Sequence, residues 1–163
     1  MTPTAQRVAI RADLLDLVAD PGLDAVETPA VRFDADTWLL VEDGRIAGRT
    51  RADPGAGWQR VDHRGRLLTP GLIDAHVHLP QLDVIASHGR ELLDWLHTYT
   101  FPAEARWADA EVARAGAERF ADALLAHGTT AALVFPTVHA ASADAMFAAA
   151  QARDMRLVCG KVL

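Results

Sequence analysis

The sequence predicts an α/β protein in which a small β module comes before alternating strands and helices. Residues 1–67 show short apolar alternations separated by turns, a pattern typical of strands. Residues 68–163 instead alternate apolar, β-branched runs with alanine-rich segments of helical spacing. Parallel strands need long crossover connections, so this order indicates a parallel sheet covered by helices. We therefore expect two domains, 1–67 and 68–163.

Within the first domain, four short alternating segments predict strands at residues 8–10, 15–18, 38–41 and 45–48. Glu42-Asp43-Gly44 joins the last two as a hairpin turn, because Asp and Gly tolerate a positive φ. Breaker residues at 52–57 (Ala-Asp-Pro-Gly-Ala-Gly) predict a loop. Together these features predict a small β-sandwich-like module.

In the second domain, apolar runs predict strands at residues 72–78, 129–134 and 157–163, and helical spacing predicts helices at 90–99, 110–127 and from Ser142 to about 152. Asp109 is expected as the N-cap of the middle helix and Gly128 as the residue that ends it. Ser142 is expected to cap the last helix. The pattern alone leaves a doubly wound sheet and part of a barrel both open. The strand-to-helix turns lack Gly-x-Gly-x-x-Gly, which argues against a dinucleotide site.

Composition excludes several classes of partner. The 163 residues carry a net charge of −6, which argues against nucleic acid or an anionic membrane as the main partner. The longest apolar stretch falls far short of the roughly 20 residues of a membrane helix. A single cysteine, Cys159, cannot form an internal disulfide, and the first residues lack the apolar run of a signal peptide. These features favour a cytoplasmic location. A complete (β/α)₈ barrel needs roughly 250 residues, so this chain is too short to hold one.

His76 and His78 are two residues apart on a predicted strand, so both imidazoles should project to the same side. They follow an apolar run and precede a polar loop, which places them at the carboxyl end of a buried strand, where α/β active sites lie. Two neutral imidazoles suit zinc, although such pairs also accept iron and nickel. Asp74 shares their face and could orient a ligand. A chance pair on a surface strand is the alternative interpretation.

The stretch from Thr69 to His78 (Thr-Pro-Gly-Leu-Ile-Asp-Ala-His-Val-His) resembles the signature of the amidohydrolase superfamily. Further segments resemble the guanine deaminases within it, namely Gln81, Leu92 to Glu104, Gly128 to Ala131 and Gly160 to Val162. The resemblance implies a partial (β/α)₈ barrel of about three βα units after the β module. It covers residues 67–163 densely and the β module loosely.

The resemblance also implies an activity, the zinc-dependent hydrolytic deamination of guanine to xanthine and ammonia. His76 and His78 then hold one zinc ion per subunit. The stretch His78-Leu79-Pro80-Gln81 borders the purine, and the Gln81 amide, which donates and accepts hydrogen bonds, helps to hold it. Full-length relatives are expected to be homodimers.

In that family, further histidines from the fifth and sixth strands, an aspartate from the eighth and a proton-shuttling glutamate complete the site. No residue of this chain matches those positions, so no catalytic residue is assigned. We expect the isolated chain to bind zinc weakly, to be inactive and to aggregate through unpaired strand edges. The alternatives are a non-catalytic or barrel-completing fragment, and a related deaminase or chlorohydrolase with another substrate.

The other residues with ionisable, aromatic or thiol side chains are expected to have structural roles. Asp83 and His88 follow the histidine pair and are expected to be solvated, and Trp95 is expected in the core. His139 follows the second strand and is a weak candidate for a further ligand. Cys159 lies in an apolar strand and is expected to be buried and inert.

Overall fold

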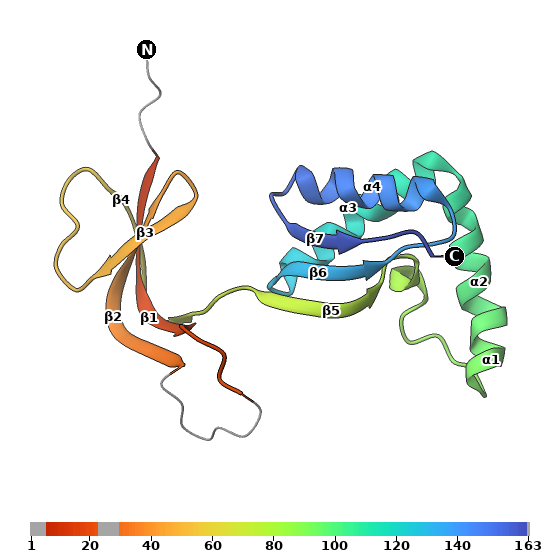
Figure 1. Ribbon diagram of the computed structural model, residues 1–163, viewed down its shortest axis with the longest axis horizontal. Coiled ribbons are helices and arrows are strands. Elements are labelled where there is room, and N and C mark those ends of the chain that lie inside the picture. The colour runs from red at the N-terminus through yellow and green to blue at the C-terminus, as the bar shows by residue number, and fades with distance from the viewer. Residues whose placement is uncertain (1–5, 23–29, 163) are drawn as a thin grey trace, which may run out of the picture. The chain divides into compact units, whose positions relative to one another are not determined.

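The computed structural model describes residues 6–22 and 30–162, and it divides into two compact units at the Pro70–Gly71 bond (Figure 1). Unit 1 runs up to Pro70 and consists of strands. Unit 2 begins at Gly71 and alternates strands with helices. No helix within the described ranges is both long and apolar enough to cross a membrane.

Unit 1 contains a four-stranded sheet in the order β3-β2-β1-β4. Its strands are β1 (Arg7–Leu17), β2 (Val31–Glu42), β3 (Arg45–Thr50) and β4 (Gln59–Leu68). β1 pairs antiparallel with β2 and parallel with β4. The predicted hairpin turn is confirmed, since Asp43 and Gly44 both have positive φ, 50° and 75°. The described part of unit 1 holds one sheet, so the two facing layers of a sandwich are not confirmed.

The sequence pattern missed β4. Six of its ten residues are charged, histidine or glutamine, and most of the strand is exposed at the edge of the sheet. An exposed edge strand needs no apolar alternation, because neither face is fully buried. Leu67 and Leu68 end this strand and pair with β1. Both therefore belong to unit 1, whereas the predicted boundary assigned residue 68 to the second domain.

Unit 2 is built on the parallel sheet β5-β6-β7, with strands β5 (Leu72–His78), β6 (Thr129–Phe135) and β7 (Arg156–Cys159). Helix α3 (Ala110–Ala126) connects β5 to β6, and α4 (Ala140–Gln151) connects β6 to β7. The three arrows run in the same direction in Figure 1. The predicted alternation of strands and helices is confirmed.

Two boundaries differ from the prediction. β7 ends at Cys159, earlier than the predicted 157–163, and Leu163 lies outside the described residues. α4 begins at Ala140 with His139 as its N-cap residue, so the prediction that Ser142 caps this helix was wrong. Ser142 lies inside the first turn, where its buried hydroxyl donates to the His139 carbonyl oxygen at 2.7 Å and accepts from the Thr137 N–H at 3.1 Å.

The connection from β5 to α3 is a series of short helices rather than one helix over 90–99. These are the 3₁₀ helix η1 (Leu79–Val84), α1 (Leu92–Trp95), the π-helix η2 (Leu96–Thr100), α2 (Phe101–Ala105) and the 3₁₀ helix η3 (Arg106–Ala108). Leu92 and Leu93 are 70% and 66% exposed, so their helical spacing does not reflect burial in this chain.

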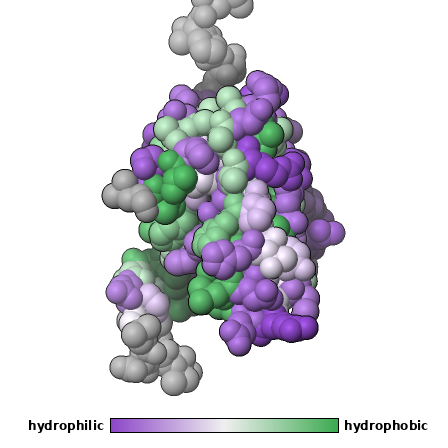
Figure 2. Space-filling model, turned by 90° about the vertical axis from the view of Figure 1, so that its right-hand side faces the viewer, coloured by the Kyte–Doolittle hydropathy of each residue, from purple (hydrophilic) through white to green (hydrophobic). Residues whose placement is uncertain are grey.

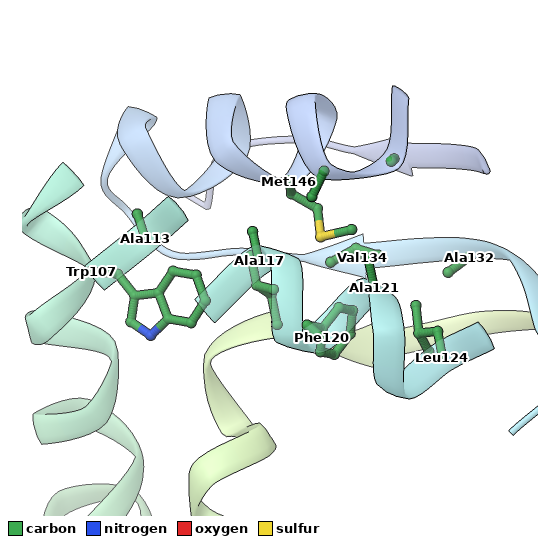
Figure 3. Packing of buried hydrophobic residues seen from close by; sticks show 12 residues of the cluster. Trp107, Ala113, Ala117, Phe120, Ala121, Leu124, Ala132, Val134 and Met146 are labelled. Carbon is green, nitrogen blue, oxygen red and sulfur yellow. The ribbon is translucent and has the colours of Figure 1, made fainter. Parts of the chain in front are cut away.

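The core of unit 2 lies between the sheet and helices α3 and α4 (Figure 3). In Figure 3, Phe120 and Leu124 of α3 and Met146 of α4 lie beside Val134 of β6. The face of α3 that is buried also carries small residues: Ala113, Gly116, Ala117 and Ala121. These let the Trp107 indole approach the helix closely, since a Cβ at Gly116 would lie 2.5 Å from that ring.

Candidate active site

The two histidines of the motif meet at the carboxyl end of β5. The Nε2 atoms of His76 and His78 are 3.2 Å apart, so both rings turn their outer nitrogens to one point. The pairing of β5 with β6 shifts register between Asp74 and Val77, which bends the strand just before this point. The structure thus brings the two imidazoles together on one side of the strand, as their spacing predicts.

Phe135, the last residue of β6, packs against both imidazoles. Its ring centroid lies 5.2 Å from that of His78, with 22° between the ring planes, and 4.6 Å from that of His76. The sequence reasoning did not single out this residue. The sequence held one signal for Phe135, namely its position at the end of a strand. The carboxyl ends of adjacent parallel strands meet at one edge of the sheet, and Phe135 pairs with His78 there. The phenyl ring restricts the rotamers of both histidines.

The surroundings of His78 favour its neutral form. Burial lowers the pKa of His78, and the nearby imidazole of His76 lowers it further. A neutral imidazole has a free nitrogen lone pair, which is the form that binds a metal. The site therefore favours the ligand form of the histidine over the imidazolium.

Asp74 and Gly71 act on the backbone of β5 and not on the imidazole rings of the histidines. The Asp74 Oδ1 accepts the backbone N–H of His76 at 3.0 Å, which holds the chain at the bend. At the start of β5, a Cβ on Gly71 would lie 2.1 Å from Thr130 Oγ1, so only glycine fits at this position. Through its carboxylate, Asp74 orients the backbone that carries His76.

The segment after the histidines is held by its first two residues. Leu79 and Pro80 are fully buried, and Leu79 belongs to the core of unit 2. Gln81 follows and is partly buried. Of the four residues expected to border a purine, His78 and Gln81 have side chains at the surface of this segment. The buried Leu79 and Pro80 fix the backbone that carries these two side chains.

Two imidazoles are only part of a metal site. Within the described ranges, no group of three or more His, Cys, Asp and Glu side chains is placed to hold a metal ion. His139 at the start of α4 therefore does not join the pair as a third ligand. The chemistry and convergence of the pair fit zinc, whose catalytic sites usually take three protein ligands.

The remaining candidates have structural roles. Asp83 forms an ion pair with Arg119 of α3 at 2.9 Å, which ties η1 to that helix. The Trp95 indole N–H donates to Ser87 Oγ at 2.7 Å and is partly buried. Cys159 was predicted to be buried, but it is only partly buried; partial burial raises the pKa of its thiol.

Two comparisons find similar proteins over nearly the whole chain. Guanine deaminase of Escherichia coli strain K12 is 39% identical over 160 residues, which are 95% of this chain and 36% of that protein. The structure of guanine deaminase from Bradyrhizobium japonicum has a TM-score of 0.85 at 35% identity, covering 95% of this chain and 35% of that one. The chain therefore spans about a third of the length of these relatives.

A third relative was solved with a ligand. Guanine deaminase from C. acetobutylicum, with bound guanine in its active site, has a TM-score of 0.77 at 26% identity, covering 96% of this chain and 36% of that one. The mixed α/β fold of this chain therefore matches the fold of the guanine deaminases. The profile of the Amidohydrolase family matches residues 67–163, more than half of the chain and all of its metal-ligand candidates. The chain belongs to the amidohydrolase family.

Proposed function

We propose that this chain provides the first metal-binding strand and a substrate-binding segment of a zinc-dependent guanine deaminase. The observation that carries the proposal is the 3.2 Å approach of the His76 and His78 Nε2 atoms at the end of β5, three residues before Gln81. The similar proteins named guanine deaminase support the choice of substrate. The net reaction adds water to guanine and releases xanthine and ammonia.

His76 and His78 would hold the zinc ion through Nε2. When bound, zinc supplies Lewis acidity, which lowers the pKa of water towards about 7 and so makes hydroxide available at neutral pH. The chain's own contribution is to keep the two imidazoles converging, with Phe135 against their rings and Asp74 holding the strand. The strands that surround the sheet in a complete barrel would bring the remaining ligands.

Gln81 would bind the purine. Its amide can donate and accept at once, which suits the mixed donor and acceptor edge of guanine. The two buried residues before it restrict where this amide can lie. We propose that the complete enzyme is a cytoplasmic homodimer and that the isolated chain turns over no guanine, because its two ligands bind zinc weakly.

The test compares two proteins. One is the chain itself, and the other is the chain fused to the part of the E. coli guanine deaminase that it does not cover. Zinc binding is measured by titration, and guanine deamination by the release of ammonia and xanthine. We expect the fusion to bind zinc tightly and deaminate guanine, and the chain alone to do neither. His76→Ala and His78→Ala should abolish both in the fusion, whereas His63→Ala in unit 1 should change neither.

Three results would contradict this account. Guanine turnover by the chain alone would show that the missing ligands are not needed. A folded fusion that binds zinc without deaminating guanine would favour a related hydrolase or a non-catalytic product. Full activity of both histidine variants would remove the pair from the site.

A further inference from the structure

We infer that Phe135 is the positioning residue of the histidine pair, and that it holds both imidazoles in the arrangement a metal ion needs before the ion binds. The inference rests on the proposed function and deepens it, because it names the contact on which the metal affinity of His76 and His78 depends. The two Nε2 atoms lie 3.2 Å apart. Two nitrogens that bind one zinc ion tetrahedrally, each at about 2.0–2.1 Å, lie roughly 3.3 Å apart. The pair therefore already has the separation of two metal ligands.

The usual means of orienting a metal-binding histidine does not act on these two rings. Such a histidine commonly donates its second ring N–H to a carboxylate or to a carbonyl oxygen. Among the residues that the structure describes, the Nδ1 atom of neither His76 nor His78 has a hydrogen-bond partner. The Asp74 carboxylate, which the sequence indicated for this task, accepts the backbone N–H of His76 instead. The orientation of the rings in this chain therefore depends on packing.

Phe135 is the residue that packs against both rings. Its ring centroid lies 4.6 Å from that of His76 and 5.2 Å from that of His78, with 37° and 22° between the ring planes. The lone pairs of an imidazole lie in the plane of its ring, so a contact with the ring face leaves them free. A phenyl ring also has no donor or acceptor that competes for them. This contact restricts the two rings and keeps their nitrogens available.

The phenyl ring is itself held in place by the sheet. Phe135 is the partner of His78 in the pairing of β5 with β6. Val134 and Pro136, on either side of Phe135, are fully buried. The backbone that carries the phenyl ring is thus fixed by the core of unit 2, and the ring is a firm support for the imidazoles.

A direct contact between the two imidazoles cannot replace this support once a metal is bound. Their Nε2 atoms lie within hydrogen-bond distance of each other. Metal binding uses the lone pairs of both nitrogens, so a hydrogen bond between them is lost when the ion binds. The contact with Phe135 involves the ring faces and remains. The two explanations therefore predict different results when Phe135 is changed.

The test is a zinc titration of the chain itself, followed through the NMR signals of the His76 and His78 rings. Phe135→Leu keeps an apolar side chain but removes the flat ring, whereas Phe135→Tyr keeps the ring. We expect Phe135→Leu to weaken zinc binding about tenfold, because two further side chains then lose their freedom on binding, and Phe135→Tyr to restore the affinity. In the metal-free chain, Phe135→Leu should also shift the signals of both histidines, because the ring current of the phenyl group is lost. Phe147→Leu, at an exposed position of α4, is the matched control and should alter neither.

A background with one histidine separates positioning from general support of the fold. In His76→Ala, zinc binds His78 alone and no second nitrogen has to be held, so Phe135→Leu should no longer change the affinity. An equal loss in both backgrounds would overturn the inference, as would an unchanged affinity of Phe135→Leu in the original chain. Equal losses in Phe135→Leu and Phe135→Tyr would also contradict it.

The titration separates this inference from the proposed function, because guanine takes no part in it. If the fusion does not deaminate guanine, the proposed function fails and the zinc affinities of the Phe135 variants still decide the inference. If zinc does not bind to the histidine pair at all, both are wrong.

Discussion

Single residues near the end of β5 hold polar groups in defined orientations. Phe135 packs against the two imidazoles, and Asp74 accepts a hydrogen bond from the backbone of His76. Each contact joins residues that are distant in sequence or lie at a bend, so each depends on the folded chain. Two residues of this region, Glu104 and Thr100, carry stability predictions.

Glu104→Gln is expected to stabilise the chain increasingly as the pH rises. Burial raises the pKa of Glu104 above 4.5, so the folded state disfavours the charged form. That cost is absent below pH 4.5, where the carboxyl is protonated in both states, and it is complete above the folded pKa. The variant should therefore gain more over the original chain at pH 7 than at pH 4 in urea unfolding. A gain that is equal at both pH values would contradict the prediction.

Thr100→Val is expected to raise the free energy of unfolding by about 1 kcal/mol. Thr100 is buried, and within the described ranges its hydroxyl has no hydrogen-bond partner. An unsatisfied buried polar group costs about 1–3 kcal/mol, and valine has nearly the same shape. Chemical denaturation measures the difference. Thr98→Val, two residues earlier and exposed, should change stability by less than about 0.5 kcal/mol. A loss of stability in Thr100→Val would show that the hydroxyl is bonded.

At the scale of elements, the helices differ in how much their own sequence determines them. α3 begins after Asp109 and is followed by Gly128 with φ 82°, both as predicted from cap signals. The predicted helix over 90–99 instead divides into α1 and the π-helix η2, and α2 follows directly. Its apolar spacing looked like one amphipathic face, but in the folded chain η2 packs against η1 and α2. Local signals determine α3, whereas its neighbours determine the segment before it.

Asp109→Ala should lower the free energy of unfolding by about 1 kcal/mol. The Asp109 carboxylate accepts the backbone N–H groups of Glu111 and Val112 at 2.8 and 3.1 Å, and alanine leaves both without this partner. Urea unfolding followed by circular dichroism measures the loss. Asp109→Ser keeps a capping oxygen and should recover most of the stability. Equal losses in both variants would show that the cap is not the cause.

At the scale of the whole molecule, each unit leaves apolar surface uncovered. Green apolar areas lie among the purple polar ones on the face shown in Figure 2. In unit 2, the sheet face opposite α3 and α4 exposes Ile73, Leu133 and Val158, at 77%, 38% and 63%. These residues border one open depression together with Ala75 and Ala131. No other element of the described chain covers these side chains, so the face presents an apolar surface.

The isolated chain is therefore expected to self-associate, and Ile73→Lys with Val158→Lys should reduce that association. Lysine at both positions adds like charges to the open face and disfavours contact between apolar surfaces. Light scattering at several protein concentrations measures the mean mass. Val138→Lys, at an exposed position in the loop before α4, is the control and should leave the association in place. Concentration-independent monomers of the unchanged chain would contradict the prediction.

The sequence alone determined the alternating order of unit 2, the caps of α3, the hairpin turn in unit 1 and the histidine pair. Each depends on local periodicity, turn chemistry or spacing along one strand, which short stretches of sequence contain. Only the tertiary structure decided the pairing of the charged strand β4, the division of the segment before α3, and the contact of Phe135 with the two histidines. These features join residues far apart in the chain, and strand pairing and packing, rather than local propensity, bring them together.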